Sequence, residues 1–358
     1  MKLPKVIESG MWKEGHIQGI AVDTERGFVY YSFTTIFLKT DMLGNPIGSV
    51  ARLAGHLGCI TLGDDGYVYG SLELKHDAIG GFIISRTGWD PSSEDSFYLV
   101  RFDTEKITRM DMDAENDGIM TAIYLRDVVD DYSGTDEVSG EKHRYGCSGI
   151  DGTAYGPVFG EAPGSRKKLM VSYGIYGDVK RFDNDHQVIL QFDVCDFERF
   201  GRPLNQSNPH HSGPNSCEKR YFIYTGNTTY GVQNLEYDSY SHNWLIAVYC
   251  GKKNDFTNYP MFICDGSVKP KEQELIGRGG EVGALLTLAK LGEAADRNGI
   301  RGVNFPYGST GVASLGNGLF YFSKNYSEKR DGAGYFGSHV TLYRYDPSDP
   351  QLFTEVDD

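Results

Sequence analysis

The sequence predicts an all-β protein built from five copies of one structural unit. Short alternating runs rich in Tyr, Phe, Val and Ile are separated by Gly, Asn and Asp along most of the 358 residues, a pattern typical of strands and tight turns. The hairpin pattern GHIQGIAVDTERGFVYYSF at Gly15–Phe33 returns as GHLGCITLGDDGYVYGSLE at Gly55–Glu73. Three more divergent copies begin at Tyr145, Tyr230 and Tyr307.

A second element supports the same count. An amphipathic strand that ends in Asp and a turn also occurs once in each unit. Asp suits this place because its side chain accepts hydrogen bonds from backbone amides two residues further on. We therefore expect a structural role for these aspartates. They are Asp41, Asp103, Asp193, Asp265 and Asp346.

Each unit is expected to contain four strands. In the first unit the strands are predicted at Ile17–Asp23, Phe28–Phe33, Ile36–Asp41 and Ile47–Leu53. In the second unit they are predicted at Leu57–Leu62, Tyr67–Leu72, Tyr98–Asp103 and Met120–Leu125. The remaining units begin near Cys147, Val232 and Ser309. Four-stranded units of about 70 residues resemble β-propeller blades, so the predicted fold is a five-bladed β-propeller that forms one domain over residues 1–358.

The first residues of the chain are expected to close the ring. The segment KVIESGMWKEGHIQG has the same pattern as IGSVARLAGHLGC, in which an outer strand leads into the next inner strand. The N-terminal strand would then be the outer strand of blade 5, which removes a free sheet edge. The tail after Asp346 is the alternative candidate for this strand.

Two further features concern packing. Small residues recur just before an apolar residue, where five inner strands would crowd around the axis. They are Gly19, Cys59, Gly149, Asn234 and Gly311. In Gly280–Gly299, apolar residues at i, i+3, i+4 and i+7 predict one short inserted helix that packs on the ring or forms an oligomer contact.

Composition excludes several classes of function. With 35 Lys and Arg against 49 Asp and Glu, the formal charge is −14, which argues against nucleic acid and anionic membranes as partners. No stretch approaches the length of a membrane-spanning helix, and the start of the chain lacks a secretory pattern, so we expect a soluble, cytoplasmic protein. Six scattered cysteines without CxxC spacing are expected to be reduced thiols. The sequence leaves the oligomeric state open.

The candidate binding face follows from an analogy with other propellers, in which ligands meet the starts of inner strands and the ends of second strands. The strand starts supply His16, Gln18, His56 and Gln233. The ends of second strands supply Glu73, Lys75, Tyr173, Tyr176, Lys324 and Asn325. Long loops gathered on the same side would add to such a face.

His16 and His56 occupy the same repeat position in adjacent blades. Two imidazoles with Gln18 and Gln233 nearby could hold a divalent metal ion or act as acid and base. The alternative is structural, in which each imidazole donates to the backbone of a neighbouring blade.

Glu73 is a candidate general acid or base at the end of its strand. A salt-bridged strand end is the plainer alternative. Asp151 and Glu236 follow inner-strand starts and could face Glu73 as the second carboxylate of a glycosidase, or pack between blades. Aromatic residues of the loops, among them Trp89, Tyr173 and Tyr176, could stack on sugar rings or fill the core.

The whole chain resembles five-bladed propellers, and its GHIQG and GHLGC hairpins are most similar to those of uncharacterised bacterial propeller proteins. The same architecture occurs in arabinanase-like glycosidases, fructan-processing enzymes, mannoside phosphorylases and the lectin tachylectin. The resemblance implies a carbohydrate-active protein, a glycoside hydrolase or lyase that acts on a small sugar or oligosaccharide in a central funnel. The alternative is a noncatalytic propeller that binds a glycan or a peptide there.

Overall fold

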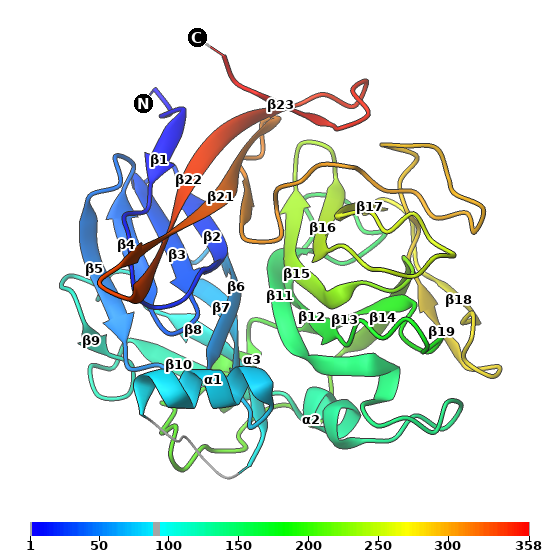
Figure 1. Cartoon of the computed structure of the whole chain (residues 1–358), viewed down its shortest axis with the longest axis horizontal. Coiled ribbons are helices and arrows are strands. Elements are labelled where there is room, and N and C mark those ends of the chain that lie inside the picture. Colours follow the sequence, from blue (N-terminus) through cyan, green and yellow to red (C-terminus); the bar gives the residue numbers. More distant parts are fainter. Residues whose placement is uncertain (1, 89–93, 358) are drawn as a thin grey trace.

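Five sheets form a ring in the computed structural model, which describes residues 2–88 and 94–357. The predicted five-bladed β-propeller is confirmed (Figure 1). Its inner strands contact one another in ring order, and the last contacts the first. These strands are β2 (Ile17–Asp23), β6 (His56–Leu62), β11 (Cys147–Pro157), β15 (Thr229–Asp238) and β20 (Val312–Ser314).

Blades 1 and 2 contain the eight predicted strands, with small shifts at the strand ends. Blade 1 runs β2, β3 (Phe28–Phe33), β4 (Phe37–Asp41) and β5 (Pro46–Ala51), and β9 (Met112–Asp113) is added in parallel at its edge. Blade 2 runs β6, β7 (Val68–Leu74), β8 (Ser96–Phe102) and β10 (Met120–Tyr124).

The other blades depart from the four-stranded plan. Blade 3 runs β11, β12 (Lys167–Ile175), β13 (His186–Phe192), β14 (Lys219–Tyr224), β19 (Val282–Leu285) and β18 (Lys271–Glu274). Blade 4 has only β15, β16 (Asn243–Tyr249) and β17 (Met261–Asp265), and single bridges to Leu288 and Val303 replace its fourth strand. Blade 5 runs β20, β21 (Leu319–Arg330), β22 (Ala333–Tyr345) and β1 (Val6–Glu8).

Both candidate segments complete blade 5. The N-terminal strand β1 pairs antiparallel with β22, with Ile7 opposite Val340. The tail strand β23 (Phe353–Glu355) pairs with a later part of β22, with Glu355 opposite Tyr343. The two ends of the chain consequently lie near each other at the top of Figure 1. The predicted closure by the N-terminal strand is confirmed, and the tail extends the same edge.

Apolar packing between neighbouring blades holds the ring together. The buried hydrophobic residues of the described chain form five clusters, each shared by two adjacent blades. Between blades 1 and 2, for example, the rings of Phe37 and Phe102 stack with centroids 4.4 Å apart. Burial of such surface is the main favourable term in folding, so every blade depends on both of its neighbours.

Close approach of the inner strands explains the small residues. A Cβ atom on Gly19 would lie 2.8 Å from the backbone nitrogen of Ile60 in blade 2. Asn234 uses its side chain to cross the ring, and its Nδ2 donates to the carbonyl of Gln18 at 2.7 Å. The crowding predicted at these positions is therefore present.

Most of the predicted aspartate turns are also present. The carboxylates of four aspartates accept hydrogen bonds from the backbone N–H two residues further on, at 2.8–3.0 Å, and these are Asp41, Asp193, Asp265 and Asp346. Asp103 forms an ion pair with Lys106 at 3.0 Å.

The helix predicted at Gly280–Gly299 is wrong. Val282–Leu285 forms strand β19, which pairs with β14 and β18. Gly283 lies against the ring of Phe222, where an added Cβ would be 2.7 Å from the ring. Pairing with the edge of blade 3 therefore outweighs the helical spacing of apolar residues, because the extended chain also buries Ala284 and Leu286.

The helices lie elsewhere. In the part of the chain that the structure describes, they are α1 (Ala78–Thr87), α2 (Arg126–Ser133), α3 (Asp196–Phe200) and the 3-10 turn η1 (Arg144–Gly146). None of the helices in the described residues is long and apolar enough to cross a membrane.

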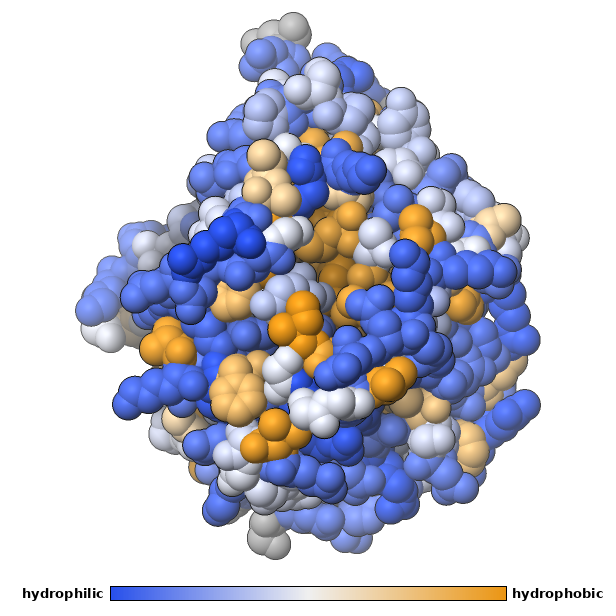
Figure 2. Space-filling model, turned by 90° about the vertical axis from the view of Figure 1, so that its right-hand side faces the viewer, coloured by the Kyte–Doolittle hydropathy of each residue, from blue (hydrophilic) through white to orange (hydrophobic). Residues whose placement is uncertain are grey.

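The outer side of blades 3 and 4 is largely hydrophilic. Figure 2 shows scattered hydrophobic residues on this side and a hollow with a hydrophobic floor. Ile276 and Val282, at the β18–β19 hairpin, are more than half exposed.

Candidate functional site

A cavity of 390 Å³ occupies one end of the ring axis, and we call it the funnel. All five blades contribute to its lining, and α1 forms one side of its mouth. Its polar floor contains predicted residues from both classes of strand position. They are His16, Gln18, His56, Glu73, Lys75 and Gln233, together with Asp151. The structure therefore brings most of the predicted site residues together.

His56 lies between two carboxyl groups. Its Nδ1 atom is 3.5 Å from Oδ1 of Asp151 and 3.7 Å from Oε2 of Glu73. Burial lowers the pKa of His56 to about 3, and the positive charge of Lys75 adds to this shift. The imidazole is therefore neutral near pH 7.

Glu73 is held by Lys75 and by the start of blade 3. Its Oε2 is 2.7 Å from Nζ of Lys75, and its Oε1 accepts a hydrogen bond from the backbone N–H of Ile150. Lys75 also donates to the carbonyl of Ser148 at 2.8 Å and lies 3.2 Å from Asp77. Burial alone would lower the pKa of Lys75, but Glu73 and Asp77 raise it, so the ammonium stays charged.

The two carboxyl groups differ in what surrounds them. Burial raises the pKa of Glu73, and the adjacent Lys75 opposes that shift. Burial also raises the pKa of Asp151 well above its usual value, and here the charge of Glu73 adds to the effect. Gln233 donates to Oδ2 of Asp151 at 3.0 Å, whereas Oδ1 has no hydrogen-bond partner among the described residues. Asp151 is therefore the carboxyl group whose pKa is raised both by burial and by a neighbouring negative charge.

A glycine in blade 3 makes this contact possible. Gly149 has φ +126°, and a Cβ atom there would lie 1.8 Å from Oε1 of Glu73. Only glycine accepts both the backbone conformation and the close approach. The small-residue position predicted for the inner strand thus also admits Glu73 from blade 2.

His16 belongs to a separate polar group on the funnel floor. Its Nε2 accepts hydrogen bonds from Nε2 of Gln18 at 3.2 Å and from the hydroxyl of Tyr249 at 3.3 Å. Gln18 also donates to Thr34 at 3.3 Å. Burial lowers the pKa of His16, so this ring too is a neutral acceptor near pH 7.

The upper wall of the funnel is mainly apolar. Ile79 and Phe82 of α1 face Phe336 of β22 and the Tyr230 ring across the mouth. The β21–β22 hairpin extends toward the funnel mouth, and a β-bridge between Phe336 and Trp12 holds it there. Figure 1 shows the hairpin crossing in front of blade 1.

Four predicted binding residues lie outside the funnel lining. Tyr173 is fully buried and donates to Asp131 at 2.6 Å, and Tyr176 packs against the ring of His143. Lys324 pairs with Glu355 at 2.7 Å, while Asn325 donates to the carbonyl of Ile17 at 3.2 Å. Each has a structural partner between blades or along a blade edge, and none of the four lines the funnel.

One further candidate lies at another place in the ring, and another lies outside the described residues. Glu236 lines a 230 Å³ cavity whose walls come from the opposite ends of the inner strands, and its Oε1 accepts from the backbone of Ser314 at 2.8 Å. Trp89 lies outside the described residues.

The donor set does not fit the predicted metal ion. No group of three or more His, Cys, Asp or Glu side chains within residues 2–88 and 94–357 could hold one. The Nε2 lone pair of His16 already accepts two hydrogen bonds. The charge of Glu73 is balanced by Lys75. We therefore assign no step to a metal.

Some lining residues were missed. Helix α1 contains two glycines, which weaken its helical signal, but its caps are readable in the sequence. Asp77 accepts from the N–H groups of Ile79 and Gly80, and Gly88 ends the helix in the left-handed conformation. Tyr249, at the end of the second strand of blade 4, follows the same positional rule as Glu73.

The fold and site define this protein as a five-bladed propeller whose axial funnel has a polar floor and a mainly apolar upper wall. No protein-family model matches the sequence, and no curated protein matches it.

Several solved structures are similar in fold. A glucose dehydrogenase shows 10% identity over 94% of this chain and 99% of its own, with a TM-score of 0.36. A carbohydrate-active enzyme of Trichoderma reesei shows 8% identity over 91% and 80%, with a TM-score of 0.39. A functionally unknown protein of Desulfotomaculum acetoxidans shows 9% identity over 95% and 69%, with a TM-score of 0.35. At these values the likeness carries no argument about activity.

Proposed function

We propose that this protein is a carbohydrate-active enzyme, a glycoside hydrolase or lyase that acts on a small sugar or oligosaccharide in the funnel. One observation carries the proposal. Two buried carboxyl groups, those of Glu73 and Asp151, approach the same nitrogen of His56 on the floor of a ligand-sized cavity. Acid–base cleavage of a glycosidic bond usually uses two carboxyl groups whose different environments give them different pKa values.

Asp151 is assigned the general acid. Burial and the charge of Glu73 raise its pKa, which favours the protonated form that a general acid needs in order to protonate the leaving oxygen. Its Oδ1 has no competing partner among the described residues. General acid catalysis of this kind contributes about 10²–10⁴-fold to a rate.

Glu73 and His56 are assigned supporting roles next to the reacting bond. Lys75 lies 2.7 Å from Glu73 and favours its ionised form, and a carboxylate at this place would stabilise the positive charge that develops on the sugar ring. Neutral His56 would help to position Asp151, because its Nδ1 lies 3.5 Å from Oδ1 of that carboxyl group. His16, with Gln18 and Tyr249, would bind sugar hydroxyl groups.

The shape and polarity of the funnel support a sugar as ligand. Its volume of 390 Å³ lies within the range of small-ligand sites. Amide, imidazole and hydroxyl groups lie on the floor, while Phe82 and Phe336 offer ring faces at the mouth. Sugars present hydroxyl groups and an apolar C–H face, so they match both surfaces. The net charge of −14 disfavours a nucleic-acid partner.

The test is turnover of a panel of aryl glycosides, oligosaccharides and uronate-containing oligosaccharides by wild type, Asp151→Asn and Glu236→Gln. We expect Asp151→Asn to lose about 10²-fold or more in kcat. Glu236→Gln is the matched control, because Glu236 lies in the cavity at the other end of the ring. Thermal unfolding of each variant checks that it is folded. Sugar binding without products in wild type would instead support the alternative, a noncatalytic binding propeller.

A further inference from the structure

A second cavity adjoins the funnel. It has a volume of 350 Å³ and lies between α1 and the start of blade 1, and we call it the side groove. The two cavities share four lining residues, which are Gly15, Thr34, Phe82 and Arg86. Shared walls place the side groove directly beside the funnel mouth.

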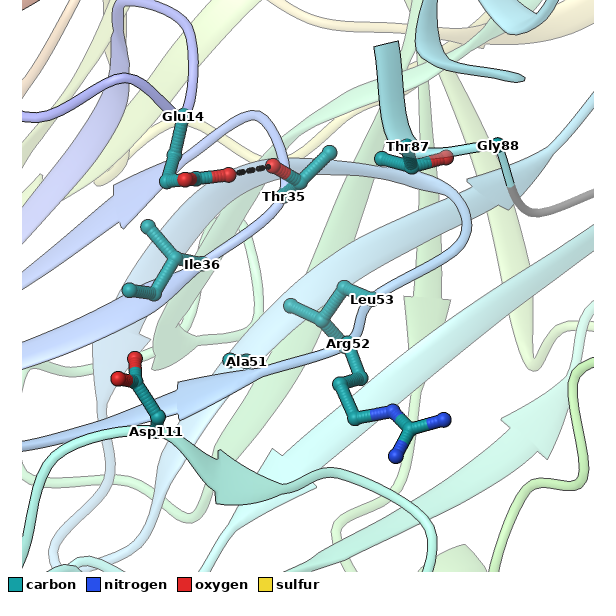
Figure 3. Close-up of a pocket in the computed structure, with 9 residues that line it drawn as sticks. All are labelled: Glu14, Thr35, Ile36, Ala51, Arg52, Leu53, Thr87, Gly88 and Asp111. Atoms are coloured by element: carbon teal, nitrogen blue, oxygen red, sulfur yellow. Dashed lines mark hydrogen bonds between the residues drawn. The ribbon is translucent and has the colours of Figure 1, made fainter. Parts of the chain in front are cut away.

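The side groove has the chemistry of a sugar-binding surface. The Phe82 ring on α1 is 54% exposed and lines both cavities. Opposite α1, Lys13 and Glu14 line the side groove and are absent from the funnel lining. The carboxylate of Glu14 accepts a hydrogen bond from the hydroxyl of Thr35 at 2.8 Å, as Figure 3 shows. An exposed aromatic side chain beside charged and hydroxyl groups suits a second sugar unit.

A glycine leaves the boundary between the side groove and the funnel free of a side chain. Gly15 has φ +86°, and a Cβ atom there would lie 2.3 Å from Oγ1 of Thr34. No side chain therefore rises from this position between the funnel and the groove. Gly15 immediately precedes His16, so the passage starts at the polar floor itself.

The opposite wall is anchored at both ends. Asp77 caps the first turn of α1, and Gly80 packs on the carbonyl of Lys75, where a Cβ atom would not fit. Near the other end, Arg86 donates to the carbonyl of Lys13 across the groove. These contacts hold α1 at a set distance from blade 1.

A third cavity continues outward and shares Glu14, Thr35 and Thr87 with the side groove. It is the cavity of Figure 3 and has a volume of 650 Å³. Its lining ends at Gly88, next to residues that the structure does not describe, so we assign it no role.

We propose that the side groove is a subsite for the next unit of a sugar chain whose terminal unit occupies the funnel. This inference rests on the proposed function, since it takes the funnel ligand to be a sugar.

The test is calorimetric titration with four ladders of xylo-, arabino-, malto- and cello-oligosaccharides from one to five units. With the ladder that binds, we expect affinity to rise by about tenfold from one unit to two or three, which corresponds to about 1.4 kcal/mol. In the double variant Lys13→Ala/Glu14→Ala this gain should disappear, while affinity for the single unit stays as in wild type.

The matched control is Glu105→Ala/Lys106→Ala, an exposed pair of the same charges in the turn after β8. It should keep the full gain with chain length. Affinity that does not depend on length in wild type, or a gain that survives in the Lys13/Glu14 variant, overturns the subsite and leaves the proposed function standing. Failure of every ladder to bind overturns both.

Discussion

The Nδ1 atom of His56 lies 3.5 Å from Oδ1 of Asp151, and neither atom has a hydrogen-bond partner among the described residues. The separation exceeds that of a normal hydrogen bond. Buried polar atoms are rarely left unpaired, because the missing bond costs free energy. Such a pair on the floor of a cavity is typical of a site that completes its hydrogen bonds with a ligand.

Burial of His56 predicts that its imidazole stays neutral well below pH 6. Burial lowers its pKa to about 3, so the imidazole nitrogen shifts in two-dimensional NMR should remain those of the neutral ring down to pH 5. The spectrum of His56→Gln assigns the signal by its loss. An imidazolium signal for His56 at pH 6 would contradict the arrangement described here.

The ion pair between Glu73 and Lys75 is expected to behave as one unit. Lys75→Met leaves the carboxylate of Glu73 buried without its 2.7 Å partner, which should cost about 3–5 kcal/mol in the free energy of unfolding. The double variant Glu73→Gln/Lys75→Met removes both charges and should recover most of that loss. Urea unfolding of the two single variants and the double variant measures the coupling. Additive losses would show that the two groups do not interact.

Gly149 is expected to tolerate no side chain. Its φ of +126° and the 1.8 Å approach of Glu73 to an added Cβ predict that Gly149→Ala loses about 1–3 kcal/mol of stability from backbone strain, and more from the clash. Displacement of Glu73 should also lower turnover. Gly164→Ala is the control, because no atom lies within 4 Å of its added Cβ. Equal thermal unfolding temperatures for the two variants would refute this.

Acid should weaken the fold through His186, the first residue of β13 in blade 3. The ring is 3% exposed and neither nitrogen has a described partner. Burial lowers the pKa of His186 from 6.5 to about 4, and nearby Arg278 adds to the shift. The unfolded chain therefore binds the proton first, so the stability from neutral His186 is present above pH 6.5 and is lost as the pH falls toward 4.

The loss should be roughly 1.4 kcal/mol for each pH unit within that window. Urea unfolding at pH 7 and pH 5 should show a smaller loss for His186→Phe than for wild type, since phenylalanine does not titrate and suits the neighbouring Phe222 and Tyr224 rings. Identical losses in both proteins would argue against this origin of the acid sensitivity.

The N-terminal strand is expected to contribute strongly to stability although it has only three residues. Ile7 is buried in the cluster between blades 5 and 1, so Ile7→Ala should cost about 2–5 kcal/mol. Val6 is 44% exposed, and Val6→Ala should change stability by no more than about 0.5 kcal/mol. Thermal unfolding distinguishes the two. A neutral Ile7→Ala would mean that the tail strand alone closes blade 5.

Repeated local signals made most of the blades predictable. The hairpins beginning at Gly15 and Gly55 carry alternation, turn residues and spacing that are local, so they indicate strands without any knowledge of partners. The same register placed His16 and His56 at equivalent strand starts, and the structure has both in the funnel lining. Repetition also predicted that the backbone is crowded at Gly149, because a small residue recurs at this position in the repeats.

Residues outside the repeated register were harder to place. The segment after Gly280 has helical spacing, yet it forms β19 because the edge of β14 offers a pairing partner distant in sequence. Lys324 and Asn325 follow the correct strand, but β21 runs on to Arg330 in a long hairpin, so these residues lie within a ladder and not at its end.

The amino-acid sequence by itself determined the number of blades, their inner strands and the polar residues that each strand start brings to the axis, because these depend on short-range pattern and steric fit. Only the tertiary structure decided that Asp151 of blade 3 meets His56 and Glu73 of blade 2, and that α1 covers one side of the mouth. Those contacts join segments far apart in the chain, and their distances depend on how closely neighbouring blades pack. The raised pKa of Asp151 arises in the same way, because burial and the charge of Glu73 exist only once the ring has closed.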